Sequence, residues 1–417
     1  MRQKVFFKTF GCRTNMFDTQ VMMSGLSDFD ITEDESEADI VIVNSCTVTN
    51  SADVSVRGYV NSQHKKGKKL FLTGCGAHSK GESLFATNKL SGVFGQSEKQ
   101  KINTLLKSDT PFYELGDLNY IDDAVVEEFV GKSRAFIKIQ EGCNFRCSYC
   151  IIPFVRGDAR SLDEKQILEQ INRLASNGFG EFILTGTNVG SYGVGEGRNI
   201  AELMQKISYI RGVRRIRVGS LEPIQINDAF REILDEPWLE RHLHIAIQHS
   251  SDEMLRIMNR RNRYSSDVEL FGMLSEKGFA LGTDFIVAHP GESDEIWREA
   301  MRNLERLNLT HIHAFTYSKR DGTPSAVMSP DVNGAVATER MRELQSIIDK
   351  NSYNFRVKNS HKKLEVLVES AKNGLFIGYD QYFNPIEISS NEDLVGNWIG
   401  IENYEVRDDK NFAKFDA

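Results

Sequence analysis

Apolar and polar positions alternate along the first quarter of the chain in a way that predicts strands separated by helices. Three short apolar runs each end in a small residue followed by cysteine: VFFKTFGC, ADIVIVNSC and KKLFLTGC. The segments between these runs are long enough for crossover helices, which is typical of parallel βαβ units. The pattern predicts an open parallel α/β sheet over residues 1–108, and the acidic segment 109–132 is expected to be a linker.

A second alternating series predicts a central barrel domain over residues 133–358. Six strands are expected at residues 135–140, 181–186, 215–220, 244–248, 283–288 and 311–316. One helix between them is expected to start with a capping box formed by Ser161 and Glu164. Six strand–helix units are fewer than the eight of a complete barrel, so we predict a partial (β/α)6 barrel.

The end of the chain changes character. Residues from about 330 to 358 form one charged helical segment, which we interpret as a connector. Residues 361–417 contain only short candidate strands, which predicts a small all-β barrel. The fold class is therefore α/β, with a parallel sheet, a partial barrel and a small β-domain in chain order.

Composition and charge limit the possible partners. The 417 residues carry a formal net charge of −8, so a uniformly basic surface for nucleic acid is excluded and RNA contacts must come from local patches. No run approaches the roughly 18 apolar residues of a membrane-spanning helix. Residues 1–12 lack the apolar core of a signal peptide. We expect a cytoplasmic, monomeric protein without a membrane partner.

Three of the six cysteines lie close together in the segment EGCNFRCSYC. Cys143, Cys147 and Cys150 have the spacing C-x3-C-x2-C directly after the first expected barrel strand, at the edge where barrel active sites lie. Three thiolates can hold three irons of a cubane cluster and leave the fourth iron free for a substrate group. The alternative is a zinc site with a distant fourth ligand, although zinc modules usually show paired C-x2-C spacing.

The other three cysteines, Cys12, Cys46 and Cys75, each follow a strand of the predicted first sheet. Ligands of open α/β sheets bind beyond the carboxyl ends of the strands, so we expect these thiols at one edge. The sheet then provides a second three-thiolate site. The alternative is that each cysteine packs singly as a small buried apolar residue.

The C-x3-C-x2-C loop resembles that of the radical S-adenosylmethionine (SAM) enzymes, with Tyr149 at the aromatic position usual before the last cysteine. The resemblance implies a 4Fe–4S cluster on this loop that binds SAM. With the second cysteine set, most of the chain resembles the radical-SAM methylthiotransferases, through motifs such as FGCRTN, VNSCTVTNSAD, TGTNVGSYG, DFIVAHPGES and FTYSKRDGT. Residues 361–417 look like the TRAM domain of that family, a small RNA-binding barrel.

This resemblance also implies a reaction. Subfamilies methylthiolate isopentenyladenosine in tRNA, threonylcarbamoyladenosine in tRNA, or a ribosomal-protein aspartate, and GCRTN with NSCTVTNSAD is most similar to the second. We therefore expect methylthiolation at C2 of N6-threonylcarbamoyladenosine 37 in the tRNA anticodon stem-loop. The implied cofactors are SAM and two 4Fe–4S clusters, and an electron-donating protein is an implied partner. A radical is needed because no ordinary general base removes the C2 proton.

By analogy with the family, SAM contacts are expected at the carboxyl ends of the barrel strands. The candidate residues are Tyr149, Arg156, Thr185, Gly186, Asn188, Ser220, Glu222 and Gln248. Thr185, Gly186 and Asn188 belong to a glycine-rich loop that would hold the methionyl amino group, and Ser220 with Glu222 would bind the ribose. The alternatives are a plain glycine turn, packed rim residues and, for Arg156, an ordinary ion pair.

A basic segment after the fourth expected strand is the candidate tRNA contact. It contains Arg256, Arg260, Arg261 and Arg263. The domain at 361–417 is acidic instead, although a single-strand RNA groove is usually positive. Two other classes of protein compete with an enzyme: an iron–sulfur electron carrier, which would need no SAM pocket, and a non-catalytic RNA-binding module.

Overall fold

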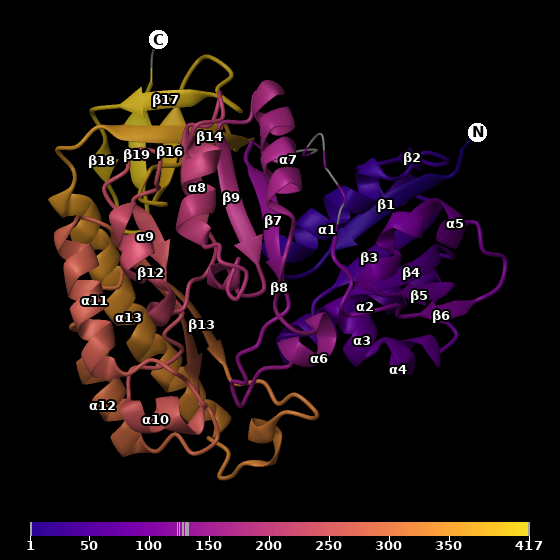
Figure 1. The fold of residues 1–417 in the computed structure, drawn as a ribbon, viewed down its shortest axis with the longest axis horizontal. Coiled ribbons are helices and arrows are strands. Elements are labelled where there is room, and N and C mark those ends of the chain that lie inside the picture. Colours follow the sequence, from indigo (N-terminus) through magenta and orange to yellow (C-terminus); the bar gives the residue numbers. More distant parts are fainter. Residues whose placement is uncertain (1, 123, 125, 127–128, 130–132, 416–417) are drawn as a thin grey trace.

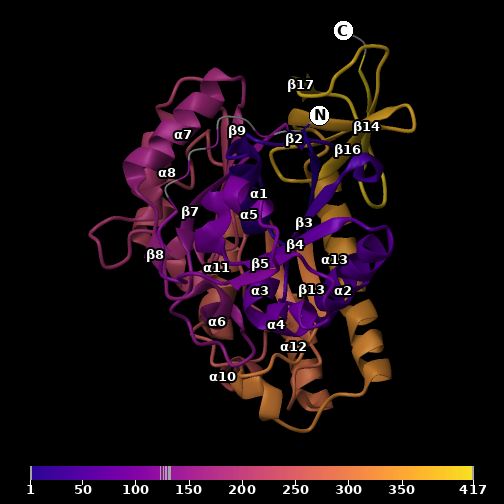
Figure 2. The same ribbon diagram turned by 90° about the vertical axis from the view of Figure 1, so that its right-hand side faces the viewer.

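The computed structural model describes residues 2–122, 124, 126, 129 and 133–415. Figure 1 shows a parallel sheet at the amino terminus, a central partial barrel and a small β-domain at one end of the barrel. In Figure 2 the amino-terminal sheet lies in front of the barrel, so the two pack side by side. The α/β class predicted from the sequence is confirmed. Among the described residues, no helix is long and apolar enough to cross a membrane.

The amino-terminal sheet has the order β2-β1-β3-β4-β5-β6, and every neighbouring pair is parallel. Its strands are β1 (Lys4–Thr9), β2 (Asp30–Ile31), β3 (Ile40–Ser45), β4 (Lys69–Gly74), β5 (Gly92–Phe94) and β6 (Phe112–Glu114). The helices are α1 (Arg13–Ser24), α2 (Asn50–Lys65), α3 (Cys75–Ser79), α4 (Gly81–Phe85) and α5 (Ile102–Leu106), with 3₁₀ turns η1 (Glu35–Glu37) and η2 (Gln96–Lys101). Ile42 and Val43 enter separate cores on opposite faces, which explains the continuous apolar runs.

The segment 109–132 differs from the linker that was expected. It supplies the edge strand β6, which at three residues is too short to stand out as an apolar run. Asp122 is buried and forms ion pairs with Lys99 and Lys138. Positions 123, 125, 127–128 and 130–132 lie outside the described residues. The first sheet therefore extends beyond the boundary expected at residue 108.

The central part contains the six parallel strands of a partial barrel. They are β7 (Ala135–Glu141), β9 (Glu181–Gly186), β10 (Arg215–Val218), β11 (His242–His244), β12 (Ala280–Val287) and β13 (His311–Thr316). The short strand β8 (Arg160–Ser161) pairs antiparallel with β7. Two hydrogen-bonded sheets, β10-β9-β7-β8 and β11-β12-β13, are joined by parallel bridges from Ile216 to Leu239 and from Leu221 to Ile245.

Helices connect these strands and cover the outside of the barrel. They are α6 (Ile152–Arg156), α7 (Glu164–Ser176), α8 (Ile200–Ser208), α9 (Asp228–Glu232), α10 (Asp252–Ile257), α11 (Tyr264–Glu276) and α12 (Asp294–Leu304), with η3 (Val189–Ser191), η4 (Pro223–Gln225) and η5 (Pro324–Val327). Helix α7 begins later than the predicted capping box, because Asp163 is its N-cap and accepts from the backbone N–H of Gln166 at 3.0 Å. Ser161 lies in β8 instead.

A long helix, α13 (Gly334–Lys358), leads to the carboxyl-terminal β-domain. Its strands are β14 (Leu364–Lys372), β15 (Leu375–Tyr379), β16 (Pro385–Ser389), β17 (Trp398–Ile401), β18 (Glu405–Val406) and β19 (Asn411–Lys414), in the order β17-β14-β15-β16-β19-β18. They form a curled half-barrel of the TRAM-like kind. Arg215 and Arg217 of β10 donate to the carbonyl oxygens of Glu365 and Asp380, which fixes this domain to the barrel.

Candidate active site

One cavity of about 760 Å³ lies between the amino-terminal sheet and the barrel. All six cysteines line it, and all six are free thiols: Cys12, Cys46, Cys75, Cys143, Cys147 and Cys150. The sequence predicted two separate three-cysteine sites. The structure places both sets on the walls of the same cavity, so both face one shared space.

The amino-terminal set lies at the carboxyl edge of the first sheet. Cys12 precedes α1, Cys46 follows β3, and Cys75 begins α3 directly after β4. The three strands are adjacent and parallel, so their carboxyl ends meet at one edge. Gly11 has a φ of +107°, and a Cβ there would lie 2.6 Å from Cys46 Cβ. Only glycine allows the Cys12 turn to approach Cys46 this closely.

A buried arginine, Arg156, contacts this set. Its Nε lies 3.0 Å from Cys75 Sγ, and its Nη1 lies 2.9 Å from a carboxylate oxygen of Asp18 and 2.5 Å from one of Glu141. Its Nη2 donates to Asn15. Because each guanidinium nitrogen is already engaged, the contact to a SAM carboxylate proposed for Arg156 does not fit, and the ion-pair alternative does.

The second set lies on the loop that follows β7. The backbone N–H of Cys143 donates to Gly157 at 3.1 Å, which closes the loop. Two side-chain donors approach the sulfurs: Asn188 Nδ2 lies 3.5 Å from Cys143 Sγ, and Arg260 Nη1 lies 3.6 Å from Cys147 Sγ. Cationic and amide donors of this kind stabilise thiolates over thiols.

Arg260 was expected on the tRNA surface, and the structure corrects this. Its side chain is 2% exposed and forms a bidentate pair with Glu222, with one Nη1–Oε1 distance of 2.8 Å. It therefore cannot reach a phosphate. Of the other candidates, Arg256 and Arg261 are exposed and Arg263 is half-buried. The Cζ atom of Arg261 lies 4.0 Å from the centre of the Phe145 ring.

The thiols are set for metal binding rather than for free reactivity. Burial raises the pKa of Cys46 to about 12, and the neighbouring Cys75 adds to the effect. Burial also raises the pKa of Cys150 to about 12, with a further contribution from Cys147. At neutral pH these thiols stay protonated until a cation displaces the protons.

The remaining SAM candidates lie on the cavity wall. They are Tyr149, Thr185, Gly186, Asn188, Ser220, Glu222 and Gln248. Gln248 has a φ of +67°, and its buried Oε1 has no hydrogen-bond partner among the described residues. An unsatisfied buried acceptor on a cavity wall is able to accept a hydrogen bond from a ligand. The wall therefore fits SAM, and the three loop thiols fit an iron–sulfur cluster.

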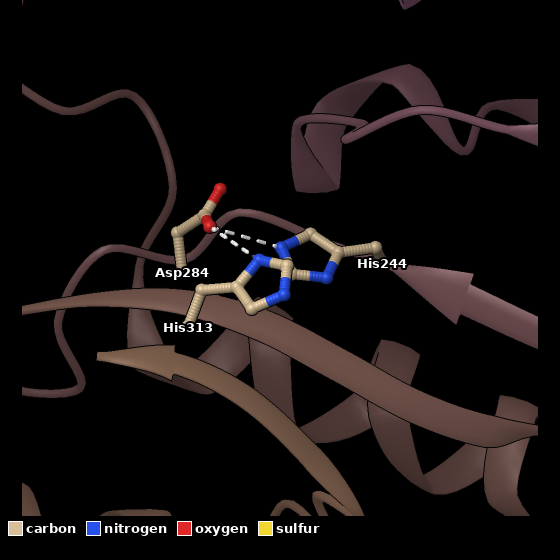
Figure 3. Close-up of side chains that lie close together, drawn as sticks. All are labelled: His244, Asp284 and His313. Carbon is tan, nitrogen blue, oxygen red and sulfur yellow. Dashed lines mark ion pairs between the residues drawn. The ribbon is translucent and has the colours of Figure 1, made fainter. Parts of the chain in front are cut away.

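Three side chains from adjacent barrel strands lie close together, as Figure 3 shows. All three line the same cavity. His244 Nε2 lies 3.1 Å and His313 Nδ1 lies 3.5 Å from Asp284 Oδ1. Burial alone would raise the pKa of Asp284, but the two histidines outweigh it and hold the pKa below its usual range. One ligand atom from each residue lies within 4.8 Å of the others, so this group has the geometry to hold a divalent cation.

Several site residues were missed by sequence reasoning. Asn15 and Asp18 follow Cys12 on α1 and hold Arg156, and Lys138 of β7 pairs with Asp18 at 2.7 Å. Glu141 pairs with the same lysine at 2.9 Å. The available signal was the presence of Lys138 and Glu141 in a strand whose seven residues are all buried, because a buried charge needs a partner.

Solved structures resemble this fold. The radical S-adenosylmethionine methyltransferase TsrM from Kitasatospora setae superposes with a TM-score of 0.57 and 14% identity, over 78% of this chain and 77% of that one. The cobalamin-dependent S-adenosylmethionine radical enzyme OxsB gives a TM-score of 0.51 and 10% identity, over 85% of this chain and 58% of that one. The fold is therefore that of the radical SAM enzymes.

Sequence comparison identifies the family within this class of enzymes. Residues 137–304 match the "Radical SAM superfamily", and residues 4–95 match the "Uncharacterized protein family UPF0004". A Helicobacter pylori protein named "Putative methylthiotransferase" is 52% identical over 99% of this chain and 100% of its own length. The chain belongs to the radical-SAM methylthiotransferase family, as the motifs indicated.

Two further relatives carry more specific names. The "Threonylcarbamoyladenosine tRNA methylthiotransferase MtaB" of Bacillus subtilis is 29% identical over 95% of this chain and 93% of its own. The "tRNA-2-methylthio-N(6)-dimethylallyladenosine synthase" of Fervidobacterium nodosum is 30% identical over 94% of each. The two identities are nearly equal, so they do not separate the two substrates.

Proposed function

We propose that the protein methylthiolates C2 of N6-threonylcarbamoyladenosine at position 37 of tRNA. The observation that carries this proposal is the meeting of two three-cysteine sets at one cavity. The loop set would hold a 4Fe–4S cluster that, when bound, supplies the reductive cleavage of SAM. The sheet-edge set would hold a second cluster at which sulfur is presented. The GCRTN motif and the names of the MtaB relatives support threonylcarbamoyladenosine as the substrate.

The chain's own residues would prepare both sites for this reaction. Asn188 and Arg260 donate toward the loop sulfurs and favour their thiolate forms. Arg156 does the same for Cys75. The orphaned Oε1 of Gln248 would accept a hydrogen bond from SAM, and this contact would orient SAM on the cavity wall.

The partners follow from the substrate. The exposed Arg256 and Arg261 and the TRAM-like domain would contact the anticodon stem-loop. An electron-donating protein would deliver the electron for SAM cleavage. We propose that the enzyme works in the cytoplasm as a monomer.

Nucleoside mass spectrometry of tRNA from a deletion strain tests the proposal. We expect the 2-methylthio derivative of threonylcarbamoyladenosine to disappear while threonylcarbamoyladenosine without the methylthio group accumulates. The wild-type gene should restore the product, and the Cys147→Ala gene should not. Loss of methylthio-isopentenyladenosine instead would move the protein to the other tRNA subfamily.

A further inference from the structure

The end of the cavity beside the TRAM-like domain holds arginines around one aromatic ring. The Cζ atoms of Arg13, Arg134 and Arg217 lie 6.0, 5.4 and 5.0 Å from the ring centre of Phe383. The ring of His242 is centred 5.3 Å from the same ring. Phe383 has a φ of +64°, which a bulky residue adopts only when its surroundings hold it there.

Arg13 differs from the other two arginines of this group. Arg217 pairs with Glu181 at 2.6 Å, and Arg134 pairs with Glu369 at 2.6 Å. The Arg13 side chain lines the cavity and makes no hydrogen bond or ion pair within the part of the chain that the structure describes. The residue is half-buried, and a partly desolvated guanidinium is stabilised when an anion binds it. This one is free to bind an anion from the cavity.

The backbone around Arg13 favours an anion as well. Arg13 is the first residue of α1, a helix of 12 residues, and the side chain of its N-cap, Cys12, makes no capping hydrogen bond. The first N–H groups of such a helix attract negative charge. Cys12, Arg13, Thr14 and Asn15 all line the cavity, so this helix end opens into it.

Two neighbouring imidazoles add hydrogen-bonding groups. The rings of His242 and His311 are centred 4.8 Å apart, and the His311 ring is centred 6.2 Å from that of Phe383. His242 Nε2 is buried and has no hydrogen-bond partner among the described residues. This end of the cavity therefore offers a guanidinium without a hydrogen bond or ion pair among the described residues, a buried imidazole nitrogen without a hydrogen-bond partner there, and an aromatic face.

We propose that Arg13 binds the carboxylate of the threonylcarbamoyl group, with His242 beside it for the threonyl hydroxyl and Phe383 for the methyl group. The inference rests on the proposed function and names the residue that would select its substrate. Guanidinium and carboxylate form two parallel charge-assisted hydrogen bonds. An isopentenyl group has no carboxylate and no hydroxyl, so it would leave the guanidinium unpaired and be rejected.

Steady-state kinetics with the reconstituted holoenzyme test this inference. The substrates are tRNA carrying threonylcarbamoyladenosine and the same tRNA with the threonyl carboxylate converted to its methyl amide. Arg13→Gln should raise KM for the natural tRNA by roughly 10- to 100-fold, the range for a charge-assisted pair, with a smaller change in kcat. The KM of Arg13→Lys for the natural tRNA should lie between those of wild type and Arg13→Gln. Arg342→Gln, which removes an exposed guanidinium of α13, should match wild type.

The amide substrate makes the result specific. Wild-type enzyme should bind it as weakly as Arg13→Gln binds the natural tRNA, and Arg13→Gln should cause no further loss on it. The wild-type arm of this comparison does not depend on whether a variant folds. Equal losses on both substrates would show that Arg13 serves the neighbouring cysteine site and would overturn the inference, as would no loss on either. If wild type fails to turn over the natural tRNA, the proposed function itself is wrong.

Discussion

The two cysteine sets rest on different scaffolds, yet each has one buried guanidinium beside a sulfur. Arg156 lies 3.0 Å from Cys75 Sγ, and Arg260 lies 3.6 Å from Cys147 Sγ. The contacts behind the two arginines differ. Those of Arg156 span the sheet and the barrel, whereas those of Arg260 stay within the barrel. The sheet-edge site is therefore coupled to the docking of two parts of the molecule, and the loop site is not.

The largest effect that would sharpen this comparison is on stability. Arg156→Ala leaves the buried carboxylates of Asp18 and Glu141 without one of their cations, which should cost about 3–5 kcal/mol. Arg260→Ala should cost only about 2 kcal/mol, because its partner Glu222 keeps 17% of its side chain exposed to water. Urea unfolding of the cluster-free proteins measures both, with Arg156→Lys as the conservative control. Equal losses would contradict the difference in coupling.

Acid should weaken the interface of the sheet and barrel first. Burial alone would raise the pKa of Asp122, but Lys138 and Lys99 outweigh it and lower the pKa to about 2. This stabilisation is present above the unfolded-state pKa and is lost as the pH falls toward 2, which amounts to about 2 kcal/mol. Asp122→Asn should therefore destabilise at pH 7 and have little effect near pH 2. A pH-independent loss in urea titrations would refute this assignment.

The stability contributed by Asp267, which lies near the loop site, should change with pH in the opposite direction. Burial raises the pKa of Asp267 to about 6, although Asn262 donates to it and Arg260 lies near. Stability from such a group is greatest at low pH and falls as the pH rises from about 4 through 6. Asp267→Asn should raise the free energy of unfolding by up to about 2 kcal/mol at pH 8 and leave it unchanged at pH 4. A lower free energy of unfolding for Asp267→Asn than for wild type at pH 8 would contradict this prediction.

The smallest expected effect is on the salt dependence of tRNA binding, to which exposed arginines should contribute and buried ones should not. Each phosphate neutralised contributes roughly 0.7 to 0.9 to the slope of log K against log salt. Arg256→Ala combined with Arg261→Ala should flatten that slope by roughly one to two units. The exposed pair Arg302 and Arg306, changed in the same way, is the control. If both double variants behave alike, the RNA surface lies elsewhere.

The strands that position both sites could be predicted from the sequence because the patterns that indicate them are local. Apolar runs ending in Cys12, Cys46 and Cys75 predicted one sheet edge, and parallel pairing places the three residues there. The start of α7 was misplaced because Asp163 offers a better-placed cap than Ser161. The two candidate residues that failed, Arg156 as a SAM contact and Arg260 as an RNA contact, failed for a nonlocal reason.

That reason is pairing between residues distant in the chain. Arg156 meets Asp18 across 138 positions, and Arg260 meets Glu222 across 38. A single sequence shows charge but not the partner that neutralises it. The same limit hid the role we propose for Arg13, which makes no hydrogen bond or ion pair within the described residues. Packing, rather than composition, decides which arginines remain free for ligands.

Iron and sulfide analysis of anaerobically reconstituted protein tests the central claim most directly. The account predicts about eight iron atoms per wild-type chain and about four in both Cys46→Ala and Cys147→Ala, since each site holds one four-iron cluster. With reductant, Cys46→Ala should still cleave SAM without forming methylthio product, and Cys147→Ala should not cleave SAM. Four irons in wild type, with no change in Cys46→Ala, would contradict a second cluster at the sheet edge.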